Sequence, residues 1–315
     1  MSKILLTGAS GFVGVAVLSS LQRNGTSVIS AVRSSAGPDK VVVGNIDGAT
    51  QWRDALQGVT CVIHSAGRAH VLNDTAPDPL AEFRAVNVAG TLNLAAQAAA
   101  CGVKRFIFLS SAKVNGEASL PGAPFTADQP SAPLDPYGVS KMEAEQGLAV
   151  LAAETGMEVV IIRPVLVYGP GVKANFLSMM SWLSKGIPLP LGAIHNRRSL
   201  VALDNLVDLI VTCIDHPGAA NQTFMASDGE DISTTELLRR LGRALGTPAR
   251  LLPLPMWLLQ LAATLLGKRA MAQRLCGSLQ VDISKTRALL NWTPPVTLNE
   301  ALQRTANDFL EQRSL

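Results

Sequence analysis

A tyrosine and a lysine lie four residues apart in the stretch Tyr137-Gly138-Val139-Ser140-Lys141. If this stretch is helical, the spacing places both side chains on one face, with the ammonium beneath the phenol. A nearby positive charge favours phenolate and lowers the pKa of a tyrosine from its ordinary value near ~10. Such a tyrosine can exchange a proton with a substrate hydroxyl. Because the spacing is common by chance, this chemistry depends on what surrounds it.

Hydroxyl side chains end an apolar run ahead of that tyrosine. The run Arg105–Leu109 predicts a buried strand, and Ser110 and Ser111 follow it directly. Tyr137 is one of only two tyrosines in the chain and follows this hydroxyl-ended strand, which favours proton chemistry over a chance match of the Tyr-x-x-x-Lys spacing. Lys113 is a further candidate for contact with the substrate.

Three glycines follow the first apolar run of the chain, in the pattern G-x-x-G-x-x-G. Gly8 permits a tight strand-to-helix turn, and Gly11 removes the Cβ that would block a pyrophosphate. Gly14 lets the next helix lie close to the sheet, and the first amide groups of that helix then face the anion. A plain turn is the alternative, but the flanking strand and helix patterns predict a dinucleotide site. The expected contacts in this loop are Gly8, Ser10, Gly11, Phe12, Val13 and Gly14.

The end of the second predicted strand should distinguish the two nicotinamide cofactors. An NAD site needs a carboxylate there for the ribose hydroxyls, whereas an NADP site needs a cation for the 2′-phosphate. The chain has Arg33 and no acid, which favours NADP(H) over NAD(H), although Arg33 could also be a solvated surface residue. Asn87 is either a bridge between backbone groups under the site or a capping or core residue. The other expected cofactor contacts are Asn45, Ile46, Ala66, Gly67, Lys141 and Pro164.

Apolar strands alternate with helical patterns from residue 3 to about 165. This alternation predicts an α/β fold with a Rossmann-type doubly wound parallel sheet. We expect a dinucleotide-binding domain over 1–170 and a smaller α/β substrate domain over 171–315, with strands near 158–162 and 200–225 crossing between them. A proline-rich loop over 118–136 should cover the site. The predicted strands are 3–7, 28–32, 41–43, 60–64, 105–109 and 158–162.

Composition excludes several other classes of protein. The net charge of +3 over 315 residues provides no basic stripe for nucleic acid. The four cysteines form no C-x-x-C pair, so neither a zinc site nor a disulfide framework is expected, and we interpret them as buried free thiols. The first residues lead into a strand without the regions of a signal peptide, so a cytoplasmic location is expected.

One segment, 251–266, is very apolar. Prolines 253 and 255 interrupt it, and the remainder is shorter than the ~20 residues of a membrane span. A packed helix is the simpler interpretation. A lid, or a surface that contacts a membrane or another subunit, is the alternative, and Lys268, Arg269 and Arg274 would suit a weak membrane-surface contact through 251–274.

These motifs together resemble the extended short-chain dehydrogenase/reductase family, in its nucleotide-sugar epimerase/dehydratase group. The resemblance implies that Ser111 and Tyr137 handle a substrate hydroxyl, that Lys141 orients the nicotinamide ribose, and that the substrate is a UDP-sugar. It also implies contacts to the UDP pyrophosphate from Asn175, Phe176 and Arg197, although Arg197 could instead form a surface salt bridge. We expect a homodimer. The motifs that carry the resemblance are 7–14, 87–91, 109–111, 137–141, 163–164 and 167–171.

Departures from the family pattern narrow the expected reaction. Dehydratases of this group have an Asp-Glu pair where this chain has Ala112 and Lys113, so dehydration is not expected. Asn115 replaces a tyrosine common in epimerases, and Leu166 replaces an asparagine. With Arg33, and with a resemblance of 68–71 and 114–117 to reductases of O-antigen sugar pathways, these features predict reduction of a UDP-4-keto-6-deoxy-hexosamine. UDP-hexose 4-epimerisation is the alternative, and a non-catalytic NADP-binding sensor or scaffold is the alternative from another class.

Overall fold

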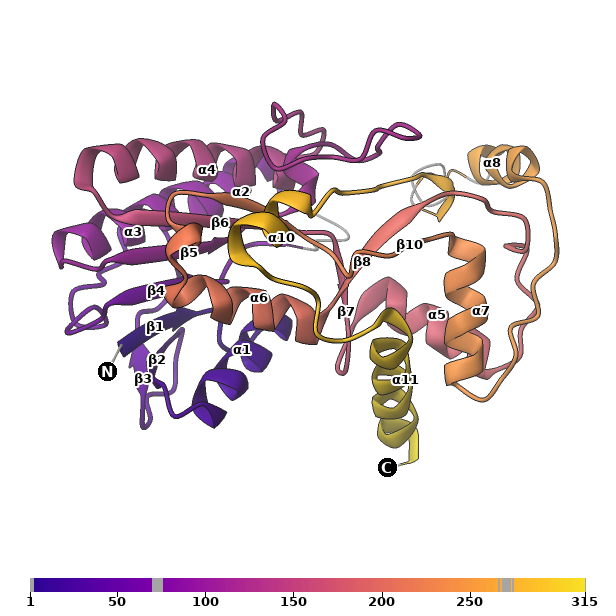
Figure 1. Cartoon of the computed structure of the whole chain (residues 1–315), viewed down its shortest axis with the longest axis horizontal. Coiled ribbons are helices and arrows are strands. Elements are labelled where there is room, and N and C mark those ends of the chain that lie inside the picture. The colour runs from indigo at the N-terminus through magenta and orange to yellow at the C-terminus, as the bar shows by residue number, and fades with distance from the viewer. Residues whose placement is uncertain (1–2, 70–75, 266, 268–272, 274, 315) are drawn as a thin grey trace.

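A seven-stranded sheet forms the centre of the computed structural model, which describes residues 3–69, 76–265, 267, 273 and 275–314 (Figure 1). Its strands pair in parallel in the order β3-β2-β1-β4-β5-β6-β9. The predicted Rossmann-type fold is therefore confirmed. The elements are β1 Lys3–Thr7, α1 Phe12–Arg23, β2 Ser27–Val32, β3 Lys40–Val42, β4 Cys61–His64, α2 Pro79–Arg84, η1 Ala85–Gly90, α3 Thr91–Ala100, β5 Arg105–Leu109, η2 Ala112–Val114, α4 Pro136–Thr155, β6 Glu158–Pro164, β7 Leu166–Tyr168, α5 Ala174–Ser184, β8 Arg198–Ala202, α6 Leu203–Asp215, η3 Pro217–Ala219, β9 Thr223–Ala226, β10 Asp231–Ile232, α7 Thr234–Ala244, α8 Met256–Leu265, α10 Ser284–Leu290 and α11 Leu298–Ser314.

The order of the strands creates a binding crevice. The chain runs outward from β1 to β2 and β3, then returns to place β4 on the other side of β1. In open parallel sheets, ligands bind outside the carboxyl ends of the strands at such a reversal. The glycine loop, which begins at Gly8, follows β1, and residues 65–67 follow β4. The two segments therefore meet where a dinucleotide would bind.

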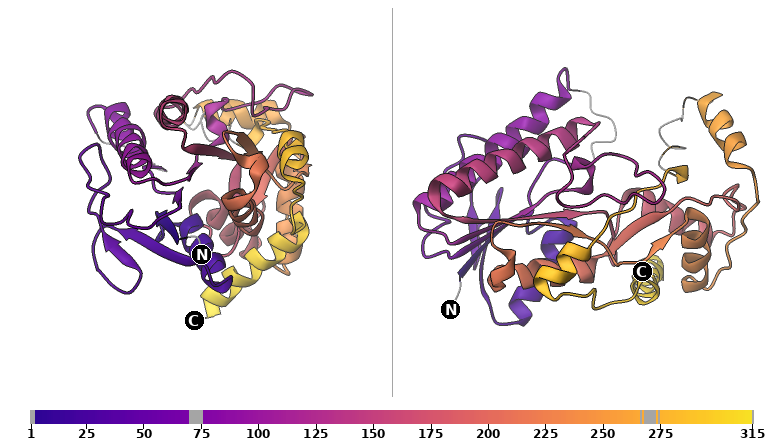
Figure 2. Two further views of the ribbon diagram at one scale, coloured as in Figure 1. Left: turned by 60° about the vertical axis from the view of Figure 1, so that its left-hand side comes forward. Right: turned by 45° about the horizontal axis from the view of Figure 1, so that its top comes forward.

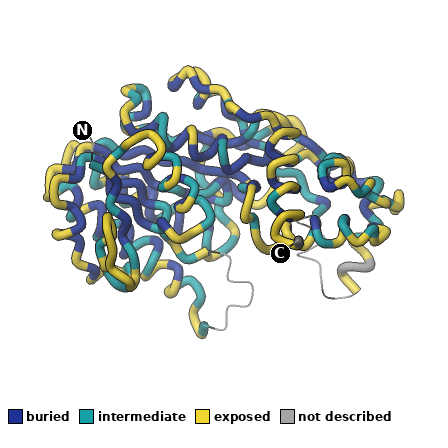
Figure 3. The backbone as a smooth tube through the Cα atoms, turned by 90° about the horizontal axis from the view of Figure 1, so that it is seen from below, coloured by how far each residue is buried: buried dark blue, intermediate teal, exposed yellow. Residues whose placement is uncertain are grey.

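Helices cover both faces of the sheet (Figure 2). On one face, α1 and α6 pack together, with Val17, Leu206 and Ile210 in a common core. On the other face, α3 and α4 bury Leu94 and Leu148 against the strands. With both faces covered, the strands are buried through the middle of the molecule (Figure 3). Burial on both faces of the sheet explains why the strand sequences are nearly continuous runs of apolar residues.

A second, three-stranded sheet has the order β10-β8-β7 and a separate core with α5, α7 and α11. The chain does not stay in this part after residue 170, because α6 packs on α1 and β9 pairs with β6. The proline-rich loop also crosses between the two parts: the Phe125 amide donates to the Gln280 carbonyl at 2.8 Å, and the Asp282 amide donates to the Phe125 carbonyl at 2.8 Å. The division of the chain at residue 170 therefore stays a prediction.

The apolar segment contains α8, which projects from the smaller part of the molecule (Figures 1 and 2). Its side chains are exposed by 63% at Trp257, 51% at Leu261 and 79% at Leu265, so the helix is not packed as the simpler interpretation required. Every helix in the described part of the chain is too short or too polar to cross a bilayer. Lys268, Arg269 and Arg274 lie outside the described residues.

Candidate active site

The glycine loop has the shape that its sequence predicts. Gly8 has a φ of +73°, a conformation that favours glycine, and its carbonyl accepts a hydrogen bond from the Gly11 amide at 2.9 Å. A Cβ on Gly14 would lie 2.0 Å from the Gly8 oxygen, so only glycine allows α1 to approach the turn. Ser10 and Gly11 are exposed at the start of α1, while Phe12 and Val13 pack partly against the core. The first amides of α1 are therefore available to an anion.

Buried polar contacts support this loop from below. His64 Nδ1 lies 2.7 Å from the Thr7 hydroxyl, and its Nε2 lies 3.0 Å from the Thr91 hydroxyl. Burial lowers the pKa of His64 to about 3, and the nearby Lys141 charge lowers it further, so this histidine is neutral at pH 7. The predicted contact Ala66 lies against the loop, since a Cβ on Gly8 would come within 2.7 Å of its amide nitrogen.

Asn87 bridges two segments beneath the site, which is one of the two roles that the sequence left open. It lies in η1, a π-helix of the kind often found at functional sites. Its Oδ1 accepts from the Arg68 amide at 2.8 Å, and its Nδ2 donates to the Arg68 carbonyl and to the Ser140 hydroxyl, both at 3.0 Å. A Cβ on Gly67 would meet Asn87 Oδ1 at 3.1 Å and Lys141 Nζ at 3.3 Å. The segment after β4 is thus tied to α4.

Ser111, Tyr137 and Lys141 come together in the structure. Ser111 follows β5, and its side chain shares a hydrogen bond with the Tyr137 phenol. Lys141 Nζ lies 6.0 Å from the centre of the Tyr137 ring and donates to the Leu109 carbonyl at 2.9 Å. The helix that carries both residues begins at Pro136, with the Asp135 carboxylate accepting from the Gly138 amide at 2.6 Å.

The prediction that the pKa of Tyr137 is lowered is wrong. Burial and, to a smaller extent, the Asp135 charge together raise the pKa of Tyr137 to about 12, against the opposing effect of the hydrogen bond with Ser111. Burial also lowers the pKa of Lys141 to about 8, with partial compensation by Glu145. The loss of hydration of the buried phenolate outweighs the effect of the nearby ammonium.

Lys113 is held by carboxylates rather than left free for a substrate. Its ammonium forms an ion pair with Asp135, the residue that caps α4, and lies 3.8 Å from Glu117. A role for Lys113 in substrate binding stays a prediction.

A buried polar network that was not predicted from the sequence lies behind the candidate catalytic residues. Glu145, one helical turn beyond Lys141, accepts from the Ser110 hydroxyl at 2.5 Å and pairs with Arg163 at 2.5 Å. Arg163 also donates to Asn115 Oδ1 at 3.1 Å. The signals for this network were a glutamate on the lysine face of the helix and an arginine inside an otherwise apolar strand.

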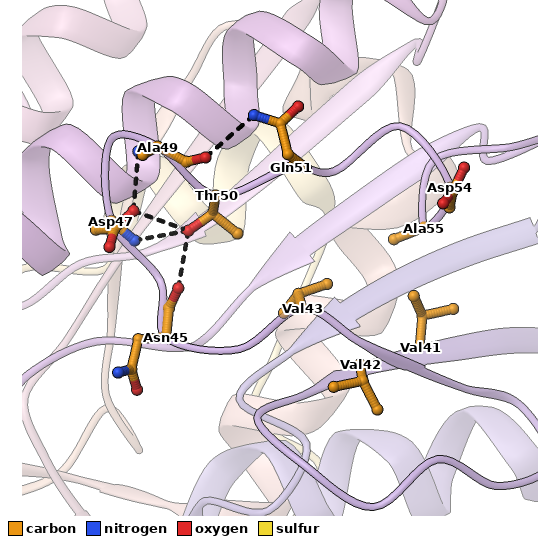
Figure 4. Close-up of a pocket in the computed structure, with 10 residues that line it drawn as sticks. All are labelled: Val41, Val42, Val43, Asn45, Asp47, Ala49, Thr50, Gln51, Asp54 and Ala55. Carbon is orange, nitrogen blue, oxygen red and sulfur yellow. Dashed lines mark hydrogen bonds between the residues drawn. The ribbon is translucent and has the colours of Figure 1, made fainter.

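The remaining predicted cofactor residues lie around the ends of the strands. Arg33 is exposed directly after β2, and Pro164 is buried at the end of β6 opposite Ala226. Ile46 packs near Gly90, where an added Cβ would lie 2.7 Å from its side chain. The Asn45 carbonyl accepts from Thr50 at 2.8 Å beside a cavity of about 480 Å³ (Figure 4). Asn45 is the only predicted cofactor residue among those that line this cavity, so the cavity does not mark the dinucleotide crevice.

The predicted substrate residues after 170 lie in the smaller part of the molecule. Asn175 is exposed in the first turn of α5, but Phe176 is buried and stacks on Tyr168 with ring centres 5.5 Å apart, so its side chain belongs to the core. Arg197 is exposed ahead of β8, and its amide donates to the Ser278 hydroxyl at 3.0 Å. A cavity of about 530 Å³ adjoins this segment, lined by Ala193, His195, Asn196, Pro253, Pro255, Met256, Cys276 and Ser278.

The predicted thiols are only partly as expected. Cys61, Cys213 and Cys276 are buried, but Cys101 is exposed at the end of α3, so the prediction is wrong for that residue. Burial raises the pKa of Cys61 to about 12, which makes this thiol unreactive at pH 7.

Comparison with known proteins decides the family. The model of the NAD dependent epimerase/dehydratase family matches residues 4–226. The chain belongs to this family. It is 53% identical over 313 residues to the UDP-glucose 4-epimerase of Vibrio cholerae, with 98% of this chain and 95% of the relative covered. The resemblance drawn from the sequence motifs is confirmed, as is the prediction that the chain is an enzyme.

Two more distant proteins also match nearly the whole chain. The N-acetyl-α-D-glucosaminyl-diphospho-ditrans,octacis-undecaprenol 4-epimerase of Escherichia coli O157:H7 is 27% identical, covering 96% of this chain and 93% of the relative. The UDP-glucuronic acid 4-epimerase of Bacillus cereus, solved in complex with NAD, has a TM-score of 0.78 at 20% identity, covering 98% of this chain and 96% of that one. At this identity the second match supports the fold alone.

Proposed function

We propose that the protein is a UDP-hexose 4-epimerase that uses NAD. The observation that carries this proposal is the 53% identity to a UDP-glucose 4-epimerase over 98% of the chain. The site supports it, because Ser111, Tyr137 and Lys141 are assembled for proton exchange with a hydroxyl. The choice of NAD follows the neighbour solved with NAD and departs from the preference for NADP(H) expected from Arg33.

The residues that would hold NAD fit that molecule. The turn at Gly8 and Gly11 leaves the first amides of α1 free for the pyrophosphate. Lys141 lies close to Gly67 at the centre of the crevice, where its amine can reach a ribose hydroxyl. NAD held there would supply a reversible hydride acceptor for the sugar carbon. Arg33, exposed at the rim of the crevice, would then face the adenine ribose.

Each of the three catalytic side chains has a separate role in proton transfer. Tyr137 takes the proton of the C4 hydroxyl as that carbon is oxidised, and it gives the proton back after the ketone has turned over. Ser111, hydrogen bonded to the phenol, supplies a hydrogen bond to the same oxygen. The Lys141 charge favours the phenolate that Tyr137 must form, because burial otherwise raises the pKa of the phenol to about 12.

Two residues that favoured a ketoreductase have structural explanations. Asn115 is buried, and its Nδ2 donates to the Thr126 carbonyl at 3.0 Å while its Oδ1 accepts from Arg163. It therefore anchors the proline-rich loop in place of a tyrosine. Leu166 is 44% exposed on β7. Residues 70 and 71 of the reductase-like segment lie outside the described residues. Reduction of a UDP-4-keto-6-deoxy-hexosamine is accordingly the second reaction to test.

The decisive experiment supplies the purified protein with three sugars in turn: UDP-glucose, UDP-N-acetylglucosamine and the 4-keto-6-deoxy derivative. Product stereochemistry is followed by NMR, and NADH and NADPH by absorbance. We expect interconversion of gluco and galacto forms without net change in the cofactor. Stoichiometric loss of NADPH with the keto sugar alone would overturn the epimerase proposal in favour of the reductase.

The chain contains a matched control for the catalytic tyrosine, because Tyr137 and Tyr168 are its only tyrosines. Tyr137→Phe should lower kcat by ~10² or more, since general acid–base catalysis contributes that much. Tyr168→Phe loses a 2.8 Å hydrogen bond to Asp228 in the other core and should keep its activity at 25 °C. Equal losses in both variants would contradict the assignment of Tyr137.

An exposed apolar helix favours a second candidate substrate, a sugar linked through diphosphate to a polyprenol. The E. coli relative is named for such a substrate. Trp257 and Leu261 on α8 are exposed, and Pro255 and Met256 line the cavity of about 530 Å³ that also includes Asn196 and Ser278. We propose that α8 lies on the membrane surface, where a lipid-linked sugar would be presented.

Vesicle sedimentation tests this second candidate. The protein should sediment with vesicles of phosphatidylcholine and phosphatidylglycerol, and Trp257→Ser with Leu261→Ser should reduce the bound fraction several-fold. Trp182→Ser serves as the control, because Trp182 is 37% exposed on α5. Binding that is absent, or equal in all variants, would remove the membrane proposal. The expected homodimer is a separate proposal, which light scattering of the purified protein tests.

A further inference from the structure

A single buried ion pair connects the segments that carry the catalytic residues. Glu145 and Arg163 have side chains that are each only 7% exposed. The carboxylate receives two hydrogen bonds from the guanidinium, from Nε at 3.0 Å and from Nη2 at 2.5 Å. It also accepts from the Ser110 hydroxyl at 2.5 Å. Such a pair is costly to bury and contributes little to stability on average, which makes its place next to the site informative.

The positions of these residues show which segments of the chain the ion pair fixes against one another. Ser110 precedes the catalytic Ser111, and Glu145 lies one turn after Lys141 on α4. Arg163 precedes Pro164 on β6 and donates to the Ala127 carbonyl in the proline-rich loop at 3.2 Å. One carboxylate therefore fixes the end of β5 against the helix that carries the tyrosine and the lysine.

We propose that Glu145 is a positioning residue for the reaction, resting on the function proposed above. Its carboxylate holds Ser111 in register with Tyr137 through Ser110, and it keeps a negative charge one helical turn from the Lys141 ammonium. Lys141 is then protonated when it meets the cofactor ribose, and Ser111 keeps its hydrogen bond to the phenol.

The charges around Lys141 support this role. Burial lowers the pKa of Lys141 to about 8, and the Glu145 charge raises it. The other titratable groups near it are Tyr137 on the same helix and His64 on β4, both of which are neutral at pH 7. Phe108 on β5 adds only its ring face, 4.4 Å from the ammonium. Glu145 therefore supplies the negative charge that favours the ammonium form.

The test removes the pair without leaving a lone buried charge. In Glu145→Gln with Arg163→Met, the pKa of Lys141 should fall further below its ordinary value, because the nearby opposite charge of Glu145 is lost. The alkaline limb of the pH profile of kcat should then move to lower pH. The alkaline limb of the pH profile of the NAD dissociation constant, measured by titration calorimetry, should move in the same direction. We expect kcat to fall ~10-fold or more with little change in KM.

Two further variants separate positioning from general damage. Ser110→Ala removes only the hydrogen bond to Glu145 and should lower kcat without moving the alkaline limb. Arg105→Met with Glu158→Gln removes a second ion pair, 2.6 Å long and more exposed, at the opposite ends of β5 and β6, and should leave both profiles in place. Circular dichroism confirms folding in each case.

The outcomes are distinct. An alkaline limb that does not move in Glu145→Gln with Arg163→Met, or that moves equally in the control pair, overturns the proposal. An unchanged kcat in Ser110→Ala overturns the part that concerns Ser111, even if the double variant fails to fold. If the wild-type protein does not epimerise UDP-sugars, the proposed function fails, whereas the pH profile of NAD binding still decides the role of Glu145.

Discussion

Replacing Lys141 by methionine should stabilise the folded protein while it abolishes catalysis. Lys141 is only 4% exposed, its ammonium donates to the Leu109 carbonyl, and Phe108 covers it on one side. Methionine keeps most of the side-chain volume and has no charge to desolvate. A catalytic residue that opposes folding is expected where function requires a buried charge.

The size of the expected stabilisation follows from the lowered pKa of Lys141. The pKa of Lys141 falls from 10.5 to about 8, mainly through burial. At ~1.4 kcal/mol for each tenfold change in affinity, the buried ammonium lowers the free energy of unfolding at pH 7 by roughly 3 kcal/mol. The lost hydrogen bond to Leu109 offsets about 1 kcal/mol of the gain. Lys141→Met should therefore raise the free energy of unfolding at pH 7 by about 2 kcal/mol.

The direction in which wild-type stability changes with pH follows from the lowered pKa of Lys141. Between pH 8 and 10.5 the unfolded chain holds the proton that the folded protein has lost, so the stability of the wild-type protein rises with pH over this range. Below pH 8 the full penalty is present, and above 10.5 it is gone. The advantage of Lys141→Met should thus be largest at pH 7 and vanish near pH 10.

Urea unfolding followed by tryptophan fluorescence at pH 7, 8.5 and 10 measures this difference. Burial keeps His64 and Tyr137, the groups that Lys141 influences, neutral in the folded protein between pH 7 and 10, so the difference in unfolding free energy isolates Lys141. A variant that is less stable than wild type at pH 7, or a difference that stays constant across the three pH values, would refute the reasoning. Loss of epimerase activity in the variant is expected in either case.

Substitutions at three other positions test the framework of the fold. Gly14→Ala places a Cβ 2.0 Å from the Gly8 carbonyl oxygen, so the loop must shift, and calorimetry should show a loss of NAD affinity of ~10-fold or more. Asn87→Ala removes the acceptor for the Arg68 amide and the donor to Ser140, and should lower the thermal midpoint and weaken NAD binding together, whereas unaltered NAD affinity would argue against the bridge. Asp228→Ala leaves the Ala202 amide, Asn205 and the Tyr168 hydroxyl without their shared acceptor; urea unfolding should show a loss of a few kcal/mol, and Asp228→Asn, which keeps an acceptor oxygen, should lose less.

Much of the sheet and of the site could be predicted from the sequence because their signals are local. A parallel strand buried on both faces appears as an apolar run, and β1, β4 and β5 were all predicted within one residue of their observed ends. The turn after β1 needs glycine at Gly8 and Gly14 for steric reasons that short-range spacing already contains. The four-residue spacing of Tyr137 and Lys141 likewise fixes one helical face.

What only the tertiary structure decided concerns burial and partners from distant parts of the chain. The pKa of Tyr137 is raised because the phenol is desolvated and faces Asp135, and neither effect follows from the lysine four residues on. Phe176 stacks on Tyr168 in the second core instead of facing a ligand. Glu145 meets Ser110 and Arg163 only because β5, α4 and β6 pack side by side. Hydration and ion pairing depend on three-dimensional neighbours, whereas backbone conformation and helical spacing are set by residues adjacent in sequence.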